Sequence, residues 1–174
     1  MEFMDVYDEN RNLTGRIRPR GQGWLPGEYG LIVCAWVYNS RAQVLLTLRA
    51  QEKTWGLTWE NSGGAAQAGE DSLTAITREV WEETGIRRSP RDFVLLRTER
   101  DGAFHLDHYA LHADVPIGDI RLLAGETVDA KWVTLEEAEA MVRRGEICDI
   151  IGREFFAQEP MLRKLMEQAA PETE

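Results

Sequence analysis

Cysteine, histidine and long apolar segments are all scarce in this chain of 174 residues. The two cysteines, Cys34 and Cys148, lie far apart without the spacing of metal ligands, so we expect reduced thiols, with Cys34 in the core. No apolar run approaches the length that spans a bilayer, so we expect no membrane contact. The start, MEFMDVYDEN, is acidic and lacks the basic-then-apolar order of a signal peptide. We therefore expect a cytoplasmic protein.

Positive charge is also in deficit, because 20 Lys and Arg face 30 Asp and Glu, for a net charge of −10. Such a field repels a nucleic-acid polymer but is compatible with a small phosphorylated metabolite that arrives with its metal ion. Arg16, Arg18 and Arg20 form the one local basic cluster. We expect Arg18 to contact a substrate phosphate; the alternative is a solvated basic strand.

Histidine is missing before His105, and the three histidines do not form an obvious ligand set. His108 and His112 are four residues apart but lie in a predicted strand, where they share one face while His105 faces the other. Six tryptophans are many for this length. An aromatic near the glycine-rich segment 61–64 could stack on a base or simply pack, and we take Trp59 as a candidate substrate contact.

Short apolar segments separated by turn signals predict strands at 31–38, 44–48, 93–98, 104–113 and 128–133, the first two as a hairpin. Helices are expected from about residue 72 to Gly85, from Thr134 (an N-cap with Glu137 as its capping box) to about residue 144, and from about 151 to 168 with an interruption near Pro160. Residues 1–29 read as an N-terminal extension. This order predicts an α/β sandwich in a single domain over residues 1–174.

The residues that carry chemistry gather in segment 64–86, GAAQAGEDSLTAITREVWEETGI. Glu79, Glu82 and Glu83 are spaced i, i+3 and i+4, so on a helix the three carboxylates share one face. An apolar stripe of Leu73, Ile76, Val80 and Trp81 should lie on the sheet and place the carboxylates at the margin of the packed surface.

Three neighbouring carboxylates repel one another, and a hard divalent cation relieves that repulsion. Mg²⁺ favours carboxylate oxygens and bridges to substrate phosphates, and Mn²⁺ is a possible substitute. The glycine segment before the helix allows close approach of the backbone to a ligand, so we expect the Gly63 carbonyl to complete the metal shell. Arg78 is spaced to pair with Glu82, or with Glu70 just before the helix.

The segment resembles the Nudix box: Gly64, five residues, Glu70, seven residues, then Arg78-Glu79, an apolar residue, any residue, Glu82-Glu83, any residue, Gly85 and an apolar residue. The resemblance implies an αβα sandwich around a mixed β-sheet and an enzyme that hydrolyses a diphosphate linkage with divalent cations. It implies Glu82 and Glu83 as metal ligands and Glu79 as a further ligand or the base. Glu126, or less closely Asp107, is a candidate for an additional ligand or base. Dimers are common in the family, so a homodimer is a further expectation.

Two other functions stay open. Asp8-Glu9-Asn10, Gly15 and the apolar run that follows are similar to the N-terminal layout of type I isopentenyl diphosphate isomerase. That enzyme uses a cysteine and histidines before its helix, whereas residues 59–64 here contain neither. The other alternative is a non-catalytic domain that senses a nucleotide or metabolite, although such domains usually have an eroded motif and this one is complete.

Overall fold

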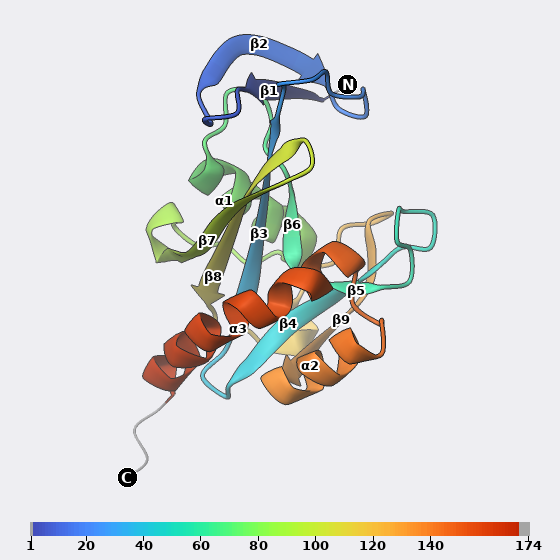
Figure 1. Cartoon of the computed structure of the whole chain (residues 1–174). Coiled ribbons are helices and arrows are strands. Elements are labelled where there is room, and N and C mark those ends of the chain that lie inside the picture. Colours follow the sequence, from blue (N-terminus) through green and yellow to red (C-terminus); the bar gives the residue numbers. More distant parts are fainter. Residues whose placement is uncertain (1, 171–174) are drawn as a thin grey trace.

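A mixed sheet of seven strands lies at the centre of the molecule, with helices on both faces (Figure 1). The computed structural model describes residues 2–170. The sheet contains β3 (Gly30–Tyr38), β4 (Gln43–Arg49), β5 (Trp59–Glu60), β6 (Ser62–Ala65), β7 (Phe93–Asp101), β8 (Phe104–His112) and β9 (Thr127–Thr134). The helices are α1 (Ser72–Thr84), α2 (Leu135–Arg143) and α3 (Asp149–Ala169), with short 3₁₀ turns η1 (Pro90–Asp92) and η2 (Ile117–Asp119). The predicted α/β sandwich with a mixed sheet is confirmed.

Strand β3 organises the sheet because its residues are almost all buried and it has three neighbours. It runs parallel to β8 along its whole length and antiparallel to β6. It meets β4 only at the register pair Tyr38 and Val44, while β4 instead pairs along its length with β9. The predicted hairpin of these two strands therefore exists, but its strands diverge after the turn and leave space for β6.

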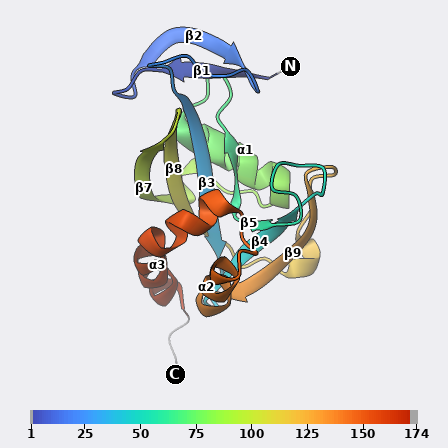
Figure 2. The ribbon, with the colours of Figure 1, turned by 45° about the vertical axis from the view of Figure 1, so that its right-hand side comes forward.

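The two faces of the sheet carry separate apolar cores, and Figure 2 shows helices on opposite sides of the strands. On one face, Val33, Ala35 and Val37 pack with Ile76 and Val80 of α1. On the other face, Trp36 and Tyr38 pack with residues of α2 and α3. This alternation along β3 follows from the two-residue period of a strand and fixes which side of the sheet each helix covers.

The N-terminal residues form a two-stranded antiparallel sheet of β1 (Phe3–Tyr7) and β2 (Leu13–Pro19), separate from the main sheet (Figure 1). The sequence indicated only an extended segment and turns. An isolated hairpin is marginal in water, and this one is tied to the body. Backbone hydrogen bonds join Tyr7 to Tyr29, and an Arg11–Asp107 ion pair reaches β8.

Three local predictions were wrong. The glycine segment expected as a loop is strand β6, paired with β3. Helix α3 continues through Pro160, because Phe155 before it and Leu162 after it are both buried in one core. On α1, the buried face follows Ala75, Ile76, Glu79, Val80, Glu83 and Thr84, so Leu73 and Trp81 are exposed rather than part of the core stripe.

Within residues 2–170, no helix is long and apolar enough to cross a membrane. The expectation of one domain over residues 1–174 stays a prediction.

Candidate active site

Helix α1 is fixed at both ends by the signals that its sequence carries. The Asp71 side chain caps the first turn by accepting a hydrogen bond from the Thr74 backbone N–H at 2.7 Å. Gly85 ends the helix in the left-handed conformation, with φ 75°. Of the three glutamates in its last two turns, Glu79 and Glu83 lie on the buried face of the helix, toward β6.

The structure brings Glu79 and Glu83 beneath the glycine strand β6, with 7% and 8% of their surfaces exposed. The Gly63 backbone N–H donates a hydrogen bond of 3.1 Å to the Glu83 carboxylate. The Glu79 carboxylate lies directly against Gly64, where an added Cβ would be 2.5 Å from its Oε1. Glu82 is the most exposed of the three, at 36% of its side chain.

Arg78 orients two of these carboxylates, and all five of its guanidinium N–H donors are used. Two go to Glu70, at 2.7 and 2.9 Å, which confirms the expected pairing with the residue before the helix. The others reach Glu79 at 2.8 Å, Glu82 at 3.2 Å and the Ala65 carbonyl at 3.1 Å. Arg78 thus joins the start of α1, its acidic face and strand β6 in one network.

No three His, Cys, Asp or Glu side chains among residues 2–170 converge closely enough to form a ready-made metal site. The contacts give the reason. Arg78 holds Glu79 and Glu82, while Glu83 turns to the Gly63 N–H. A cation would have to replace some of these contacts and draw the three carboxylates together.

The buried acids are costly to ionise in this arrangement. Burial, with added repulsion from the charges of Glu60 and Glu79, raises the pKa of Glu83 well above its ordinary value. Burial also raises the pKa of Glu79, although Arg78 opposes the shift. Arg78 pairs with Glu79, whereas Glu83 has no cationic partner at that distance. A bound cation would therefore reduce the cost of ionising Glu83 more than that of ionising Glu79.

Glu60 is an acidic residue of this region that the sequence reading missed. It is 6% exposed, it forms an ion pair with Arg49, and burial raises its pKa despite that partner. Its position directly before the glycine segment and next to Trp59 was a signal. In a strand the two side chains must face opposite ways, so if one packs in the core the other faces the site.

The candidates for an additional acidic ligand lie in different places. Glu126 pairs with Lys53 at 2.5 Å, and its charge contributes to the raised pKa of Glu60, so it lies on the Glu60 side of the site. Asp107 is occupied elsewhere, by Arg11, Ser72 and Thr98. Of the two, Glu126 is the one whose charge acts on Glu60.

The structure gives the two predicted substrate contacts other partners. Arg18 forms an ion pair with the buried Glu28 and donates a hydrogen bond of 2.9 Å to the Gly23 carbonyl. Its side chain is left 15% exposed. Trp59 packs at the edge of the core under α2 and α3, with the Lys131 ammonium 4.0 Å from its ring centre. His108 is buried, with its ring between the Cys34 thiol and the Glu99 carboxylate.

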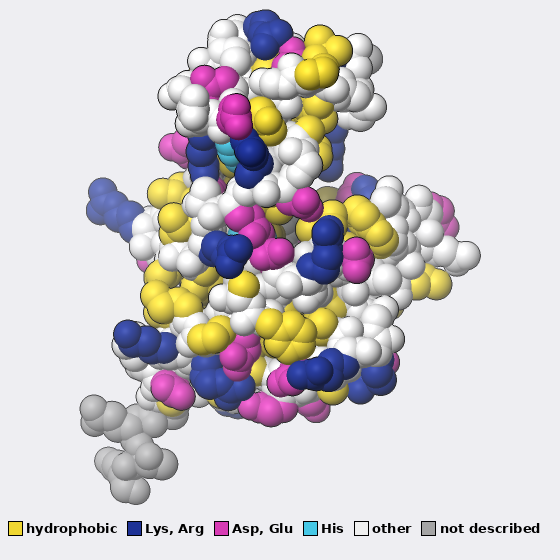
Figure 3. All heavy atoms as spheres, in the orientation of Figure 1, with side chains coloured by type: hydrophobic (Ala, Val, Ile, Leu, Met, Phe, Trp, Pro, Cys, Tyr) yellow, Lys and Arg dark blue, Asp and Glu magenta, His cyan; other side chains and the backbone are white. Residues whose placement is uncertain are grey.

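Two hollows adjoin the glycine strand. One, about 310 Å³, lies on the α3 side of the sheet and is bordered by Gly63, Gly64 and Glu60; we call it the α3-side cavity. The other, about 360 Å³, lies toward the N-terminal hairpin and shares Ile32, Gly64 and Phe104 with the first. In the space-filling view, acidic and basic side chains meet in the middle of the face below the hairpin lobe (Figure 3).

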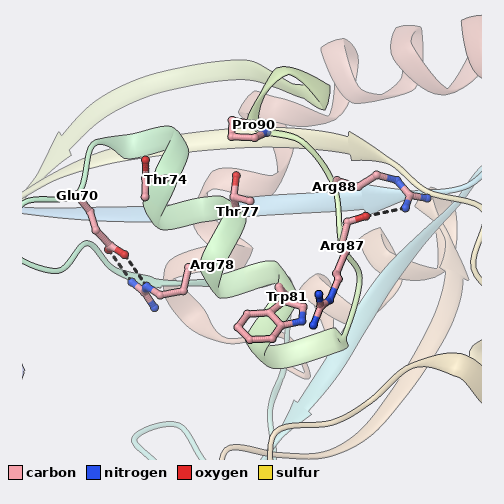
Figure 4. Close-up of a pocket in the computed structure, with 8 residues that line it drawn as sticks. All are labelled: Glu70, Thr74, Thr77, Arg78, Trp81, Arg87, Arg88 and Pro90. Carbon is pink, nitrogen blue, oxygen red and sulfur yellow. Dashed lines mark hydrogen bonds and ion pairs between the residues drawn. The ribbon is translucent and has the colours of Figure 1, made fainter.

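A wider surface hollow of about 610 Å³ lies on the outer side of α1. Figure 4 shows Arg78 turned toward Glu70 at one end and the Trp81 ring beside Arg87 at the other. Glu79, Glu82 and Glu83 do not line this hollow. It is therefore separate from the carboxylate cluster, despite its size.

Comparison with known proteins agrees with this geometry. The family model described as NUDIX domain matches residues 28–148. An uncharacterised Nudix hydrolase of Listeria monocytogenes is 35% identical over 153 residues, which cover 84% of this chain and 88% of that one. An isopentenyl-diphosphate Delta-isomerase of Pectobacterium atrosepticum is 37% identical over 84 residues, but these cover only 47% of this chain and 46% of the isomerase. The crystal structure of DR0079 from Deinococcus radiodurans has the same fold, with TM-score 0.72, 20% identity and coverage of 94% and 98%.

Proposed function

Because this chain belongs to the Nudix family and is a hydrolase, we propose that it cleaves the phosphoanhydride bond of a small diphosphate metabolite with the help of Mg²⁺, which Mn²⁺ can replace. The proposed metal-binding groups are the carboxylates of Glu79, Glu82 and Glu83 and the carbonyl of Gly63, with Glu126 as an additional ligand. The observation that carries the proposal is the burial of Glu79 and Glu83 beneath a strand of two adjacent glycines.

The donor set suits a hard cation. Carboxylate and backbone carbonyl oxygens are the ligands that Mg²⁺ prefers, and Gly64 leaves the Glu79 carboxylate space that any side chain would fill. The raised pKa of Glu83 also marks a buried acid without enough positive charge nearby. When bound, the ion neutralises charge on the phosphate oxygens and favours attack by water.

The protein groups divide the remaining work. Glu82 and Glu83 bind, while Glu79 either binds or accepts a proton from the attacking water. Arg78 acts as a positioning residue, because it holds Glu79 and Glu82 and is itself anchored by Glu70. The complete set of acids favours turnover over a purely sensory role.

The net charge of −10 favours a small phosphorylated substrate over a nucleic-acid polymer. The free, buried thiols of Cys34 and Cys148 agree with the cytoplasmic location that we propose. Isomerisation is the weaker candidate, since its resemblance covers about half of the chain and residues 59–64 lack the cysteine and histidine that it would need. We also propose a homodimer, which a measurement of the molecular mass in solution would test.

The test is a screen of diphosphate compounds in Mg²⁺, with phosphate release and product identity both measured. We expect hydrolysis that a chelator abolishes and that falls by at least about 10²-fold in Glu83→Gln. Glu167→Gln, on the exposed surface of α3, is the matched control and should keep full activity. Chelator-resistant turnover, or a Glu83→Gln variant that keeps most of its rate, would contradict the proposed metal site.

A further inference from the structure

The hollow of about 610 Å³ on the outer side of α1 lies apart from the carboxylate cluster, and we call it the outer α1 hollow. Thr74, Thr77 and Trp81 on the outer ridge of α1 and residues 87–90 after the helix line it (Figure 4). Leu73 lies one helical turn before Thr77 on the same ridge. Because Leu73 is 37% and Trp81 45% exposed, this ridge presents apolar surface to solvent beside the hollow.

Positive charge gathers at the same end of α1. Arg87, Arg88, Arg91 and Arg121 are all exposed, and within residues 2–170 none of them forms an ion pair with a carboxylate. Most other arginines of the chain do form such a pair. We call these residues the arginine patch, and they stand out in a chain whose net charge is −10.

The patch is attached to the hollow through the end of α1. The Arg87 guanidinium lies 5.1 Å from the centre of the Trp81 ring. The Arg121 backbone N–H donates a hydrogen bond of 2.9 Å to the Thr84 carbonyl in the last turn of the helix. Arg91 belongs to the turn η1, which packs against α1. Apolar surface and cations without partners therefore lie side by side.

The acids closest to the patch in the sequence and in the hollow are already engaged. The Asp92 carboxylate accepts a hydrogen bond of 2.9 Å from the Ser89 backbone N–H and so closes the turn η1. Glu70, at the other end of the hollow, pairs with Arg78 at 2.7 Å. The charge that lines the outer α1 hollow is therefore positive on balance.

We propose that the outer α1 hollow and the arginine patch bind an acidic peptide segment of a partner protein. Carboxylates of the segment pair with the arginines, and an apolar side chain of the segment rests against Trp81 and Leu73. Charge complementarity selects this partner, because the patch offers cations that the chain itself does not neutralise. The inference does not depend on the proposed hydrolase function.

The spread of the cations favours a peptide over other anions. A single phosphate group needs donors that converge, whereas Arg87 and Arg88 point in different directions, and Arg88 also borders a separate hollow with His112 and Asp114 (Figure 4). A nucleic acid carries uniform negative charge past the patch, where the net charge of −10 repels it. A peptide can carry its carboxylates only where the arginines lie.

Fluorescence anisotropy in chelator, where no metal-dependent turnover occurs, measures this binding. The probes are labelled peptides that combine a run of glutamates with one leucine or phenylalanine, and their controls have glutamine in place of glutamate. We expect the glutamate peptides to bind and the glutamine peptides not to bind. Raising NaCl from about 50 mM to about 300 mM should weaken binding by roughly 3-fold or more, because salt screens exposed charges.

Variants test which side chains are responsible. Arg87→Glu should raise Kd by roughly 10-fold or more, and Trp81→Ala and Leu73→Ala by roughly 3-fold or more each. Lys164→Glu, exposed on α3, changes the charge by the same amount and is the matched control, which should bind as wild type does. The melting temperature of each variant verifies that it is folded.

The proposal is overturned if no glutamate peptide binds, if Lys164→Glu weakens binding as much as Arg87→Glu, or if single-stranded RNA of mixed sequence binds more tightly than every peptide. It is also overturned if Arg87→Glu converts a dimer into a monomer in a measurement of the molecular mass, because the surface would then belong to a second copy of the chain.

Discussion

Glu83 shows how one side chain can link stability to function. Its carboxyl group is buried near two other acids, and its folded-state pKa is raised while the unfolded chain titrates at the ordinary value. A group with a raised folded pKa stabilises the fold below its unfolded pKa, and this contribution is lost as the pH rises through the folded pKa. Ionised Glu83 therefore destabilises the metal-free protein at neutral and alkaline pH.

We expect metal-free Glu83→Gln to melt at a higher temperature than wild type at pH 8, and the gap to shrink as the pH falls toward 4. The reason is that Gln resembles the protonated acid in size and carries no charge to desolvate. Thermal melts in chelator across this pH range measure the gap, with Glu167→Gln as a control whose difference from wild type stays constant. A gap that is independent of pH would mean that Glu83 ionises normally.

At the residue scale, regular spacing made it predictable that Glu79, Glu82 and Glu83 lie close together on one helix. A helix converts a linear interval into a shared face, and Asp71 and Gly85 fixed where that helix starts and stops. Glu60 was not predictable in the same way, because it comes from another strand and its meaning depends on how β5 lies against α1. The Arg18–Glu28 pair was not predictable either, since nothing local revealed that the buried Glu28 would lie against Arg18; the substrate contact of Arg18 stays a prediction.

Strand β6 is the element where packing and chemistry meet, and its two glycines differ. A Cβ at Gly63 would lie 2.4 Å from the Val33 carbonyl oxygen, which is fixed backbone, whereas a Cβ at Gly64 meets the movable end of Glu79. We expect Gly63→Ala to lower the free energy of unfolding by roughly 1–3 kcal/mol. Gly64→Ala should change stability less but displace the Glu79 carboxylate and reduce kcat/KM.

Urea unfolding and steady-state kinetics on the two alanine variants test this distinction. Gly125, in an exposed turn with nothing near its Cβ position, is a poor control because its φ is 81°. Gly23, which has open space and no left-handed backbone, is the better one. Equal loss of stability in both β6 variants would show that the carboxylate does not yield as the geometry indicates.

Among the elements, those with local signals were predicted well. The capping box of Thr134 and Glu137 starts α2 as expected, and the turn at Asp101-Gly102 joins β7 to β8. Pro160 misled, because the cost of a proline inside a helix is offset by burial of Phe155 and Leu162 against strands that are distant in the sequence. The glycine segment misled for the same reason, since only β3 makes it a strand.

At the scale of the whole molecule, an acidic protein should gain stability from the ion that its site requires. We expect millimolar Mg²⁺ to raise the melting temperature of wild type, and more strongly at pH 8 than at pH 5.5, because the carboxylates must lose protons before they bind. Melts in NaCl of equal ionic strength control for general screening of the net charge of −10. A rise of the same size in Glu83→Gln would place the ion elsewhere.

The fold brings the two cysteines of the chain to the same place. Cys34 on β3 and Cys148 at the start of α3 are its entire complement of sulfhydryl groups, and both border the same cavity. A thiol-selective electrophile that labels this protein must therefore react beside the α3-side cavity. Labelling yield would then report whether that space is filled, with no engineered handle and no background from other positions.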